Sequence, residues 1–269
     1  MSHCLLVVAL AAEARPLIEG FKLSLQRQGP FRQYGNNELT LVECGIGKLA
    51  AAAGTSAVLA ELTQSYSHCS CLNIGIAGAD QPGGTLFAAH QIIDRASQKT
   101  WYPQLTGLPV TETTIIETVD QPESQYQPDK AFEMEASGFV EAATRYTSLE
   151  FVHCLKVVSD NPTMAMDTLT RQRVSDLVHS HLETVKKVIT AMGELAGRLP
   201  VSSSTAVREA LSSYGQQFRL STTQQSHLQQ LLNRHHALHG TVPPLPGHNN
   251  TKQLIKELSD TLDAYRQSY

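Results

Sequence analysis

The chain has 269 residues, of which 41% are hydrophobic and 17% are charged, which is typical of a globular protein with a sizeable core. Its formal net charge of −4 argues against a basic face for nucleic acid, and no apolar run reaches the ~20 residues that a membrane span needs. We therefore expect neither nucleic acid nor membrane among its partners.

The first residues, Met1-Ser2-His3-Cys4-Leu5, lack the basic stretch that opens a secretory signal. The five cysteines lie mostly in apolar, strand-like runs, and their odd number indicates reduced, buried thiols. Both features predict a cytoplasmic protein.

Apolar runs alternate with helical segments up to about residue 195. Continuous apolar or β-branched runs predict buried strands at 4–11, 39–44, 71–76, 86–94, 109–119 and 151–158. Helices are predicted to begin near residue 14 and to cover 49–61, 131–146 and 166–195. This alternation predicts an α/β fold in which helices cover both faces of a parallel or mixed sheet.

Polar and glycine-rich residues follow several of these strands directly. Glu13 follows the first, Gly45–Lys48 the second, Gly75–Gly78 the third, and Ser159-Asp160 the last. Ligands of such sheets bind at the carboxyl ends of the strands, so we expect these residues on one rim. Each also has a plain interpretation, because glycines permit turns and half of such aspartates are expected to cap the next turn.

The predicted helix at 131–146 contains an unusual carboxylate. On a helical wheel, Glu135 shares the apolar side with Phe139, Ala142 and Tyr146. A carboxylate is costly there unless it is paired, which makes Glu135 a site candidate. The alternative is that Glu135 only favours the positive end of the helix.

Three further patterns have modest interpretations. Gly45-Ile46-Gly47-Lys48 lacks the spacing of a P-loop. His153 and Lys156 alternate along the last predicted strand, as on an exposed edge. His235, His236 and His239 could hold a metal, but a solvated helix end explains them better, and we predict no metal site.

The composition changes near residue 197, after which Ser, Gln and His are frequent. We predict one domain over 1–197 and a helical extension of unknown role over 198–269. The extension contains helical segments near 205–214, 222–238 and 251–265, and Ser221 and Gln224 have the spacing of a capping box.

Five stretches occur together in an order that resembles the nucleoside phosphorylase/nucleosidase superfamily. The similarity is greatest to its methylthioadenosine/S-adenosylhomocysteine nucleosidase and futalosine hydrolase branches. The stretches are ALAAEARPL (9–17), ECGIGKLAAAA (43–53), NIGIAGA (73–79), FEMEAS (132–137) and VVSDN (157–161). The resemblance covers residues 3–195 and implies a three-layer α/β fold with a central mixed β-sheet flanked by helices.

The resemblance also implies roles for particular residues. Asp160 would protonate the leaving base and Glu13 would hold the attacking water, which makes them the expected catalytic pair. Glu135 would bind the ribose hydroxyls. The other expected substrate-binding residues are Met134, which would pack on the sugar, and Ile76, Ala77, Gly78 and Ser159.

The resemblance therefore implies an N-ribosyl hydrolase that cleaves a purine-type nucleoside or thionucleoside without a cofactor. Phosphorolysis, with phosphate as co-substrate, stays open because Arg15 and Arg95 could hold a dianion. Family members form dimers or hexamers, and by analogy we expect a homodimer.

The segment between Trp101 and Phe132 is shorter than the family's base-contacting region. It keeps one strand and a polar turn, 120–124. Trp101 and Tyr102 could supply a stacking face for the base, but core packing is the safer interpretation for Trp101. This shortening, together with the added C-terminal helices, leaves open a catalytically impaired nucleoside-binding or regulatory protein.

Overall fold

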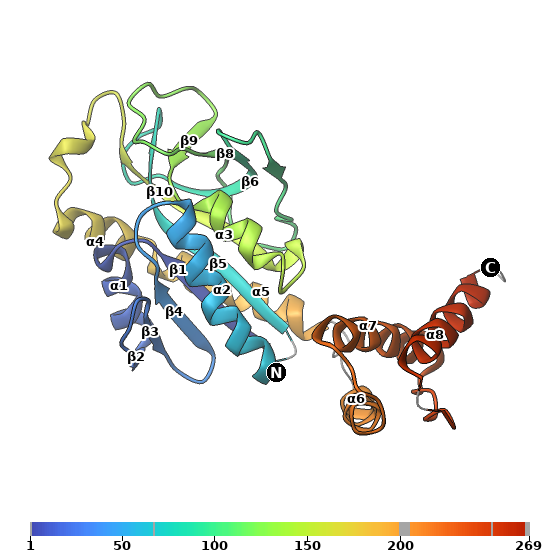
Figure 1. Ribbon diagram of the computed structural model, residues 1–269. Helices are drawn as coiled ribbons and strands as arrows, with labels where there is room; N and C mark the ends of the chain where they lie inside the picture. Colours follow the sequence, from blue (N-terminus) through green and yellow to red (C-terminus); the bar gives the residue numbers. More distant parts are fainter. Residues whose placement is uncertain (1, 67, 199–204, 249, 267–269) are drawn as a thin grey trace. The chain divides into compact units, whose positions relative to one another are not determined.

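The computed structural model describes residues 2–66, 68–198, 205–248 and 250–266. The chain divides into two compact units, Met1–Leu199 and Pro200–Tyr269 (Figure 1). The strands are β1 (Ser2–Val8), β2 (Ser24–Arg27), β3 (Arg32–Gly35), β4 (Leu39–Glu43), β5 (His68–Ala79), β6 (Leu86–Asp94), β7 (Thr100–Trp101), β8 (Thr113–Thr118), β9 (Lys130–Glu133) and β10 (Val152–Asp160). The helices of the first unit are α1 (Ala11–Phe21), α2 (Lys48–Ser65), α3 (Ala136–Ala143), α4 (Arg171–Ser180) and α5 (Leu182–Arg198).

The described strands form one mixed sheet. Its parallel centre consists of β4, β1, β5 and β10, and the β2–β3 hairpin extends it beyond β4. Beyond β5 the sheet closes on itself, because β5 pairs with both β10 and β9, and β6 and β8 complete the circuit between them. The result is a five-stranded closed ring joined to an open twisted sheet.

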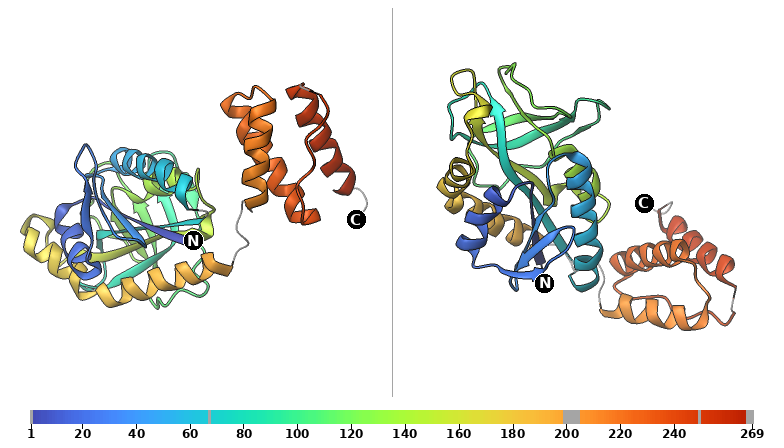
Figure 2. Two further views of the ribbon diagram at one scale, coloured as in Figure 1. Left: turned by 90° about the horizontal axis from the view of Figure 1, so that it is seen from below. Right: turned by 60° about the vertical axis from the view of Figure 1, so that its left-hand side comes forward.

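Helices cover both faces of this sheet (Figure 2). Helices α2 and α3 bury Val58, Leu59, Phe139 and Val140 in one apolar cluster. Helices α1, α4 and α5 bury a second cluster on the opposite face. The three-layer α/β architecture with a central mixed sheet is therefore confirmed.

A close crossing joins α2 and α3. A side-chain Cβ at Gly138 would lie 1.8 Å from the carbonyl oxygen of Lys48, so only glycine fits this position. The crossing holds the N-terminal ends of the two helices together.

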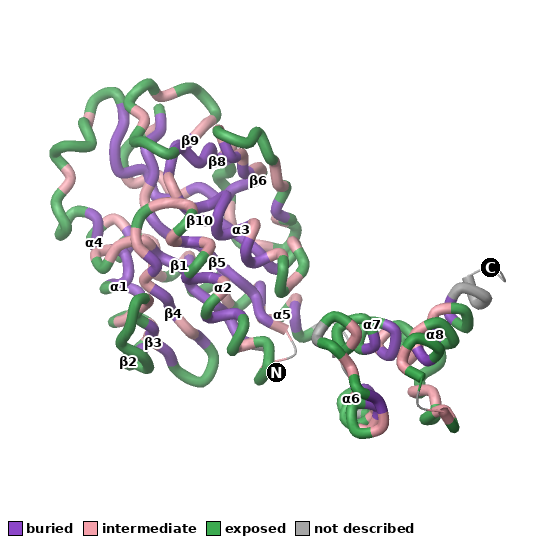
Figure 3. Tube along the Cα trace, in the orientation of Figure 1, coloured by how far each residue is buried: buried purple, intermediate pink, exposed green. Residues whose placement is uncertain are grey.

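The strand β10 is a correction to the sequence interpretation. His153 and Lys156 do not mark an exposed edge, because every residue of β10 is buried (Figure 3). The strand lies between β5 and β6, and the helical layers cover it on both sides. Lys156 belongs to an interior polar cluster with Glu133 and Glu135, whereas the ring of His153 contacts the backbone carbonyl of Glu150.

Two helix boundaries also differ from expectation. The stretch predicted to open a helix at 131 is strand β9, and the helix α3 begins only at Ala136. The single helix predicted over 166–195 is divided into α4 and α5. The side chain of Thr170 accepts a hydrogen bond from the backbone N–H of Arg173, so α4 begins only at Arg171, and the break between α4 and α5 falls at His181.

The second unit contains the helices α6 (Thr205–Gln217), α7 (Thr222–His239) and α8 (Thr251–Arg266). They enclose their own apolar cluster, to which Tyr214, Phe218, Leu228 and Leu258 contribute. The predicted C-terminal helices are therefore confirmed.

Candidate active site

A cavity of about 310 Å³ lies at the carboxyl ends of β1, β5 and β10. All eight residues that the sequence suggested for the site line it. They are Glu13, Ile76, Ala77, Gly78, Met134, Glu135, Ser159 and Asp160. The strand ends thus gather these residues on one rim.

Glu13 is held by backbone amides on both of its carboxylate oxygens. Oε2 accepts hydrogen bonds from the N–H groups of Ala9 (3.0 Å) and Leu10 (2.9 Å), and Oε1 accepts one from Ile76 (3.0 Å). The side chain is buried, and burial raises its pKa against the opposing effects of Lys156 and these amides. Glu13 is therefore a fixed carboxylate with raised affinity for a proton.

Glu135 is the residue that precedes α3, so it does not occupy a helical stripe. Its Oε1 accepts a hydrogen bond of 2.8 Å from the backbone N–H of Gly47, at the start of α2. Burial raises its pKa to about 7, Lys156 opposes this shift, and the nearby Glu133 adds to it. The favourable end of a helix thus stabilises this carboxylate, but the helix is α2 rather than its own.

Ser159 and Asp160 are directed towards the cavity by a β-bulge. Val158 pairs with Ala77 and Asp160 pairs with the next residue, Gly78, so Ser159 is the extra residue of the bulge. The carboxylate of Asp160 accepts hydrogen bonds from the hydroxyls of Ser159 and of Tyr126 (2.5 Å). It does not cap the following turn, where the side chain of Asn161 accepts from the backbone N–H of Thr163 instead.

The residues behind the cavity include an ion pair that the sequence did not indicate. Lys156 is only 1% exposed, and its Nζ lies 2.9 Å from Glu133 Oε2 and 3.9 Å from Glu135 Oε2. Burial would lower the pKa of Lys156, but the surrounding carboxylates, Glu133 foremost, raise it well above its usual value. The lysine therefore remains charged inside the fold.

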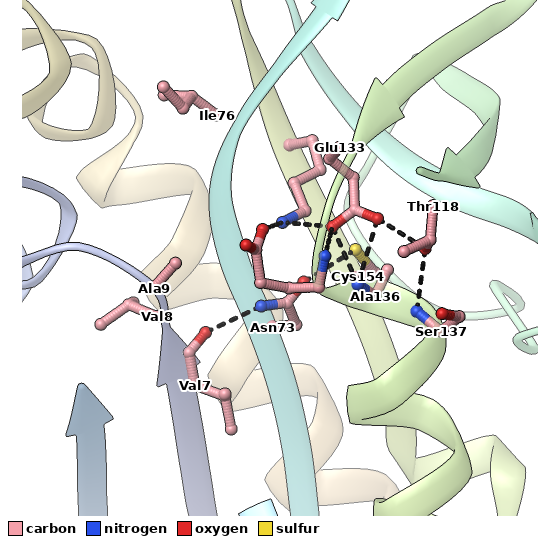
Figure 4. Close-up of polar contacts among 12 residues, drawn as sticks. Val7, Val8, Ala9, Asn73, Ile76, Thr118, Glu133, Ala136, Ser137 and Cys154 are labelled. Atoms are coloured by element: carbon pink, nitrogen blue, oxygen red, sulfur yellow. Dashed lines mark hydrogen bonds and ion pairs between the residues drawn. The ribbon is translucent and has the colours of Figure 1, made fainter. Parts of the chain in front are cut away.

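Glu133 connects this lysine to the start of α3. Its carboxylate accepts hydrogen bonds from the backbone N–H groups of Glu135 and Ala136 and from the hydroxyl of Thr118. In Figure 4, Thr118 lies between Glu133 and Ser137. Its hydroxyl oxygen accepts a hydrogen bond of 2.9 Å from the backbone N–H of Ser137. The carboxylate oxygens of Glu133 and the hydroxyl oxygen of Thr118, which lie at the start of α3, therefore all have hydrogen-bond partners.

The described residues that line the cavity carry several carboxylates but no lysine or arginine. Arg15 is 64% exposed and pairs with Glu19. Arg95 pairs with Glu117 and Glu123. Neither arginine lines the cavity, although Arg95 pairs with Glu123, which does, and lies over the ring of Phe132. The lining itself is acidic.

Neither residue suggested as a stacking face borders this cavity. Trp101 packs against the apolar cluster beneath α2 and α3, and Tyr102 is 65% exposed. Phe132 and Glu123 line the cavity instead, from β9 and from the segment before it.

The described residues hold no cluster of His, Cys, Asp or Glu arranged to bind a metal. Within the same residues, no helix combines the length and the apolar character needed to cross a membrane.

No protein-family model matches the chain, and no curated protein matches its sequence. Solved structures do match. The apo form of 5′-methylthioadenosine nucleosidase from Arabidopsis thaliana is 18% identical with a TM-score of 0.59, over 71% of this chain and 96% of that one. Native futalosine hydrolase from Helicobacter pylori strain 26695 is 18% identical with a TM-score of 0.57, over 70% of this chain and 97% of that one.

A third match is a point mutant of the Helicobacter pylori nucleosidase MTAN, solved with 5′-methylthioadenosine in its active site. It is 15% identical with a TM-score of 0.57, and the match covers 70% of this chain and 98% of that one. The first unit of the chain therefore has the fold of these proteins almost from end to end.

Proposed function

We propose that this chain, which has the fold of nucleosidases, is an N-ribosyl hydrolase that cleaves the N-glycosidic bond of a purine-type nucleoside or thionucleoside. The observation that carries the proposal is the gathering of Glu13, Glu135 and Asp160 around one cavity. Hydrolysis of this bond needs a proton donor for the leaving base, a group that holds water, and a group that orients the sugar. Each of the three carboxylates suits one of these roles.

Asp160 is the proton donor in this proposal. As the bond between C1′ and the base nitrogen breaks, the base gains electron density and takes a proton from the carboxyl group of Asp160. The β-bulge at Ser159 directs Asp160 to the cavity, and two hydroxyl hydrogen bonds hold its carboxylate. The base therefore leaves as a neutral molecule.

Glu13 holds the water that attacks C1′. Two backbone amides donate to Oε2 and one donates to Oε1, so Oε1 keeps a lone pair to which water can donate. As the water oxygen bonds to C1′, one water proton passes to Glu13. The raised pKa of this buried carboxyl group favours that transfer.

Glu135 orients the ribose by accepting hydrogen bonds from its hydroxyls, and Met134 packs on the sugar. The amide of Gly47 occupies one oxygen of Glu135 at 2.8 Å, which fixes the direction of the other lone pairs. A polar contact of this kind also rejects sugars that lack the hydroxyls, because the buried carboxylate would lose its partners.

Hydrolysis is favoured over phosphorolysis by charge. A phosphate dianion would enter a cavity whose described lining includes Glu13, Glu133 and Glu135 but no basic residue. Lys156 lies behind these groups and already pairs with Glu133. Water carries no charge and meets no such repulsion.

The test is to incubate the full chain with methylthioadenosine, S-adenosylhomocysteine, futalosine and inosine, each with and without phosphate, and to measure free base. We expect release without phosphate from at least one of them. Release that requires phosphate would identify a phosphorylase instead. Binding of a nucleoside by calorimetry without any release, in a correctly folded chain, would identify a binding protein and contradict the proposal.

A further inference from the structure

Tyr126 contacts the proposed proton donor directly. Its hydroxyl donates a hydrogen bond of 2.5 Å to Oδ2 of Asp160, while the hydroxyl of Ser159 donates to Oδ1. Both oxygens of one carboxylate are thus held by hydroxyl groups from different parts of the chain. Tyr126 belongs to the short segment between β8 and β9, the region where the base-contacting loop was expected.

The segment that carries Tyr126 is fixed on both sides of it. On one side, Glu123 forms a 2.7 Å ion pair with Arg95 and accepts hydrogen bonds from the N–H groups of Ser124 and Gln125. On the other side, the carbonyl of Asp129 accepts hydrogen bonds from the backbone of Ile115 and the side chain of Thr114. Tyr126 therefore belongs to a segment that hydrogen bonds and an ion pair hold in place.

The ring of Tyr126 fits closely against β5. A Cβ at Gly78 would lie 2.6 Å from Cε1 of Tyr126 and 2.6 Å from Oδ2 of Asp160. Only a residue without a side chain lets the ring and the carboxylate meet at this point. Gly78 thus serves the contact between Tyr126 and Asp160.

A hydroxyl group can hold a proton donor in both of its charge states. It donates to Oδ2 of the carboxylate, and it still donates to Oδ2 when the acidic proton of Asp160 lies on Oδ1, because each carboxyl oxygen has two lone pairs. Burial, and then the hydrogen bond to Asp160, raise the pKa of Tyr126, so the phenol keeps its own proton. A phenylalanine would fill the same space without this hydrogen bond.

We propose that Tyr126 is a positioning residue, which holds Oδ2 of Asp160 and so directs the proton of Asp160 towards the leaving group. This inference rests on the proposed function, because it assigns to Tyr126 a part in the same proton transfer. The inference also gives a role to the shortened segment between β8 and β9, because its Tyr126 sets the orientation of the Asp160 carboxyl group.

The first test compares Tyr126→Phe with the wild type on two ribosides. One is the nucleoside that the wild type hydrolyses fastest, and the other is 4-nitrophenyl β-riboside, whose leaving group departs as an anion without a proton. We expect kcat on the nucleoside to fall by about tenfold to a hundredfold, as for impaired acid catalysis, with KM nearly unchanged. The rate on the nitrophenyl riboside should stay the same.

The matched control is Tyr102→Phe, which removes a hydroxyl from an exposed tyrosine outside the cavity and should leave both rates unchanged. Equal losses on the two substrates, or no loss on either, would overturn the inference while the proposed function stands. A wild-type chain that cleaves neither substrate would overturn the proposed function and this inference with it.

A second test needs only the nucleoside. Because Tyr126 acts through Asp160, Tyr126→Phe should cause no further loss in a chain that already carries Asp160→Asn. Independent losses that multiply in the double variant would show that Tyr126 does not act through Asp160, and the inference would fall.

Discussion

Glu135 is a buried carboxylate whose pKa is raised to about 7, by burial and then by its neighbours. In the unfolded chain its pKa is near the usual 4.5, so between pH 4.5 and 7 the native state binds more protons. Its contribution to stability is therefore complete below pH 4.5 and is lost as the pH rises through 7. A shift of this size corresponds to a few kcal/mol at most, since each pKa unit is worth about 1.4 kcal/mol.

We expect the difference in unfolding free energy between the wild type and Glu135→Gln to change across this window. Relative to the variant, the wild type should lose on the order of 2 kcal/mol between pH 4.5 and 7. Urea unfolding at several pH values measures this difference. Parallel stability curves for the two proteins would contradict the assignment of the raised pKa to Glu135.

Asp160→Asn removes the acidic proton while keeping the shape of the side chain. If the acid role is correct, kcat on a nucleoside should fall by about two to four powers of ten, with substrate binding less affected. Steady-state kinetics measures both quantities. Asp176→Asn, on the exposed face of α4, is the matched control and should leave kcat unchanged.

Glu13→Gln tests the water-holding role in the same way. The amide keeps an oxygen for the N–H groups of Ala9 and Leu10, loses the hydrogen bond from Ile76 and cannot take a proton from water, so the hydrolytic rate should fall by about two powers of ten or more. Glu19→Gln, near the end of the same helix, is an exposed control. A Glu13→Gln variant with the full rate would refute the role.

The place of Glu13 and Asp160 on the rim of the cavity could be predicted because each lies at or shortly after the end of a buried strand, and strand ends meet at one rim. Lys156 could not. A lysine in a strand indicates solvent on its face, and only the closed ring of strands reveals that β10 is buried on both faces. Tyr126 was missed because an irregular segment has no periodicity, so the direction of its side chain cannot be derived.

At the scale of elements, the crossing of α2 and α3 positions Glu135. Gly138 makes the crossing possible, and Gly47 at the start of α2 supplies the amide that holds Glu135. The sequence predicts the start of α3 too early, because the apolar stripe of Phe139, Ala142 and Tyr146 does not show where the helix begins. In the structure, Phe132 belongs to β9, whose pairing with β5 and β8 outweighs the local helical pattern.

Gly138→Ala should therefore affect both stability and substrate binding. The new Cβ would collide with the backbone of Lys48, which cannot rotate away, so we expect a loss of about 3 kcal/mol in unfolding free energy. KM should rise as Gly47 moves away from Glu135. Thermal unfolding and kinetics measure the two effects.

Gly193→Ala is the matched control, because Gly193 lies in the helix α5 and nothing lies within 4 Å of a Cβ built there. This substitution should be neutral or stabilise the chain by up to about 1 kcal/mol. Similar losses in the two variants would show that the crossing of α2 and α3 is not special.

At the scale of the whole molecule, the two units have separate apolar clusters. The proposed chemistry uses only residues of the first unit. A chain that ends at Leu199 should therefore fold and hydrolyse the nucleoside at nearly the full rate, as circular dichroism and a base-release assay would measure. Loss of folding in this shorter chain would show that the first unit depends on the second.

The closed ring of strands has a consequence for the order in which this protein can take shape during synthesis. The strand β5 ends at Ala79, but its partner β10 begins only at Val152, and the ring cannot close before that later strand is available. Pairing between strands so far apart in the sequence is slow, because the long loop between them must lose conformational entropy before the stabilising contacts form. We therefore expect the nascent chain to expose the edge of β5 to chaperones until residue 160 has left the ribosome.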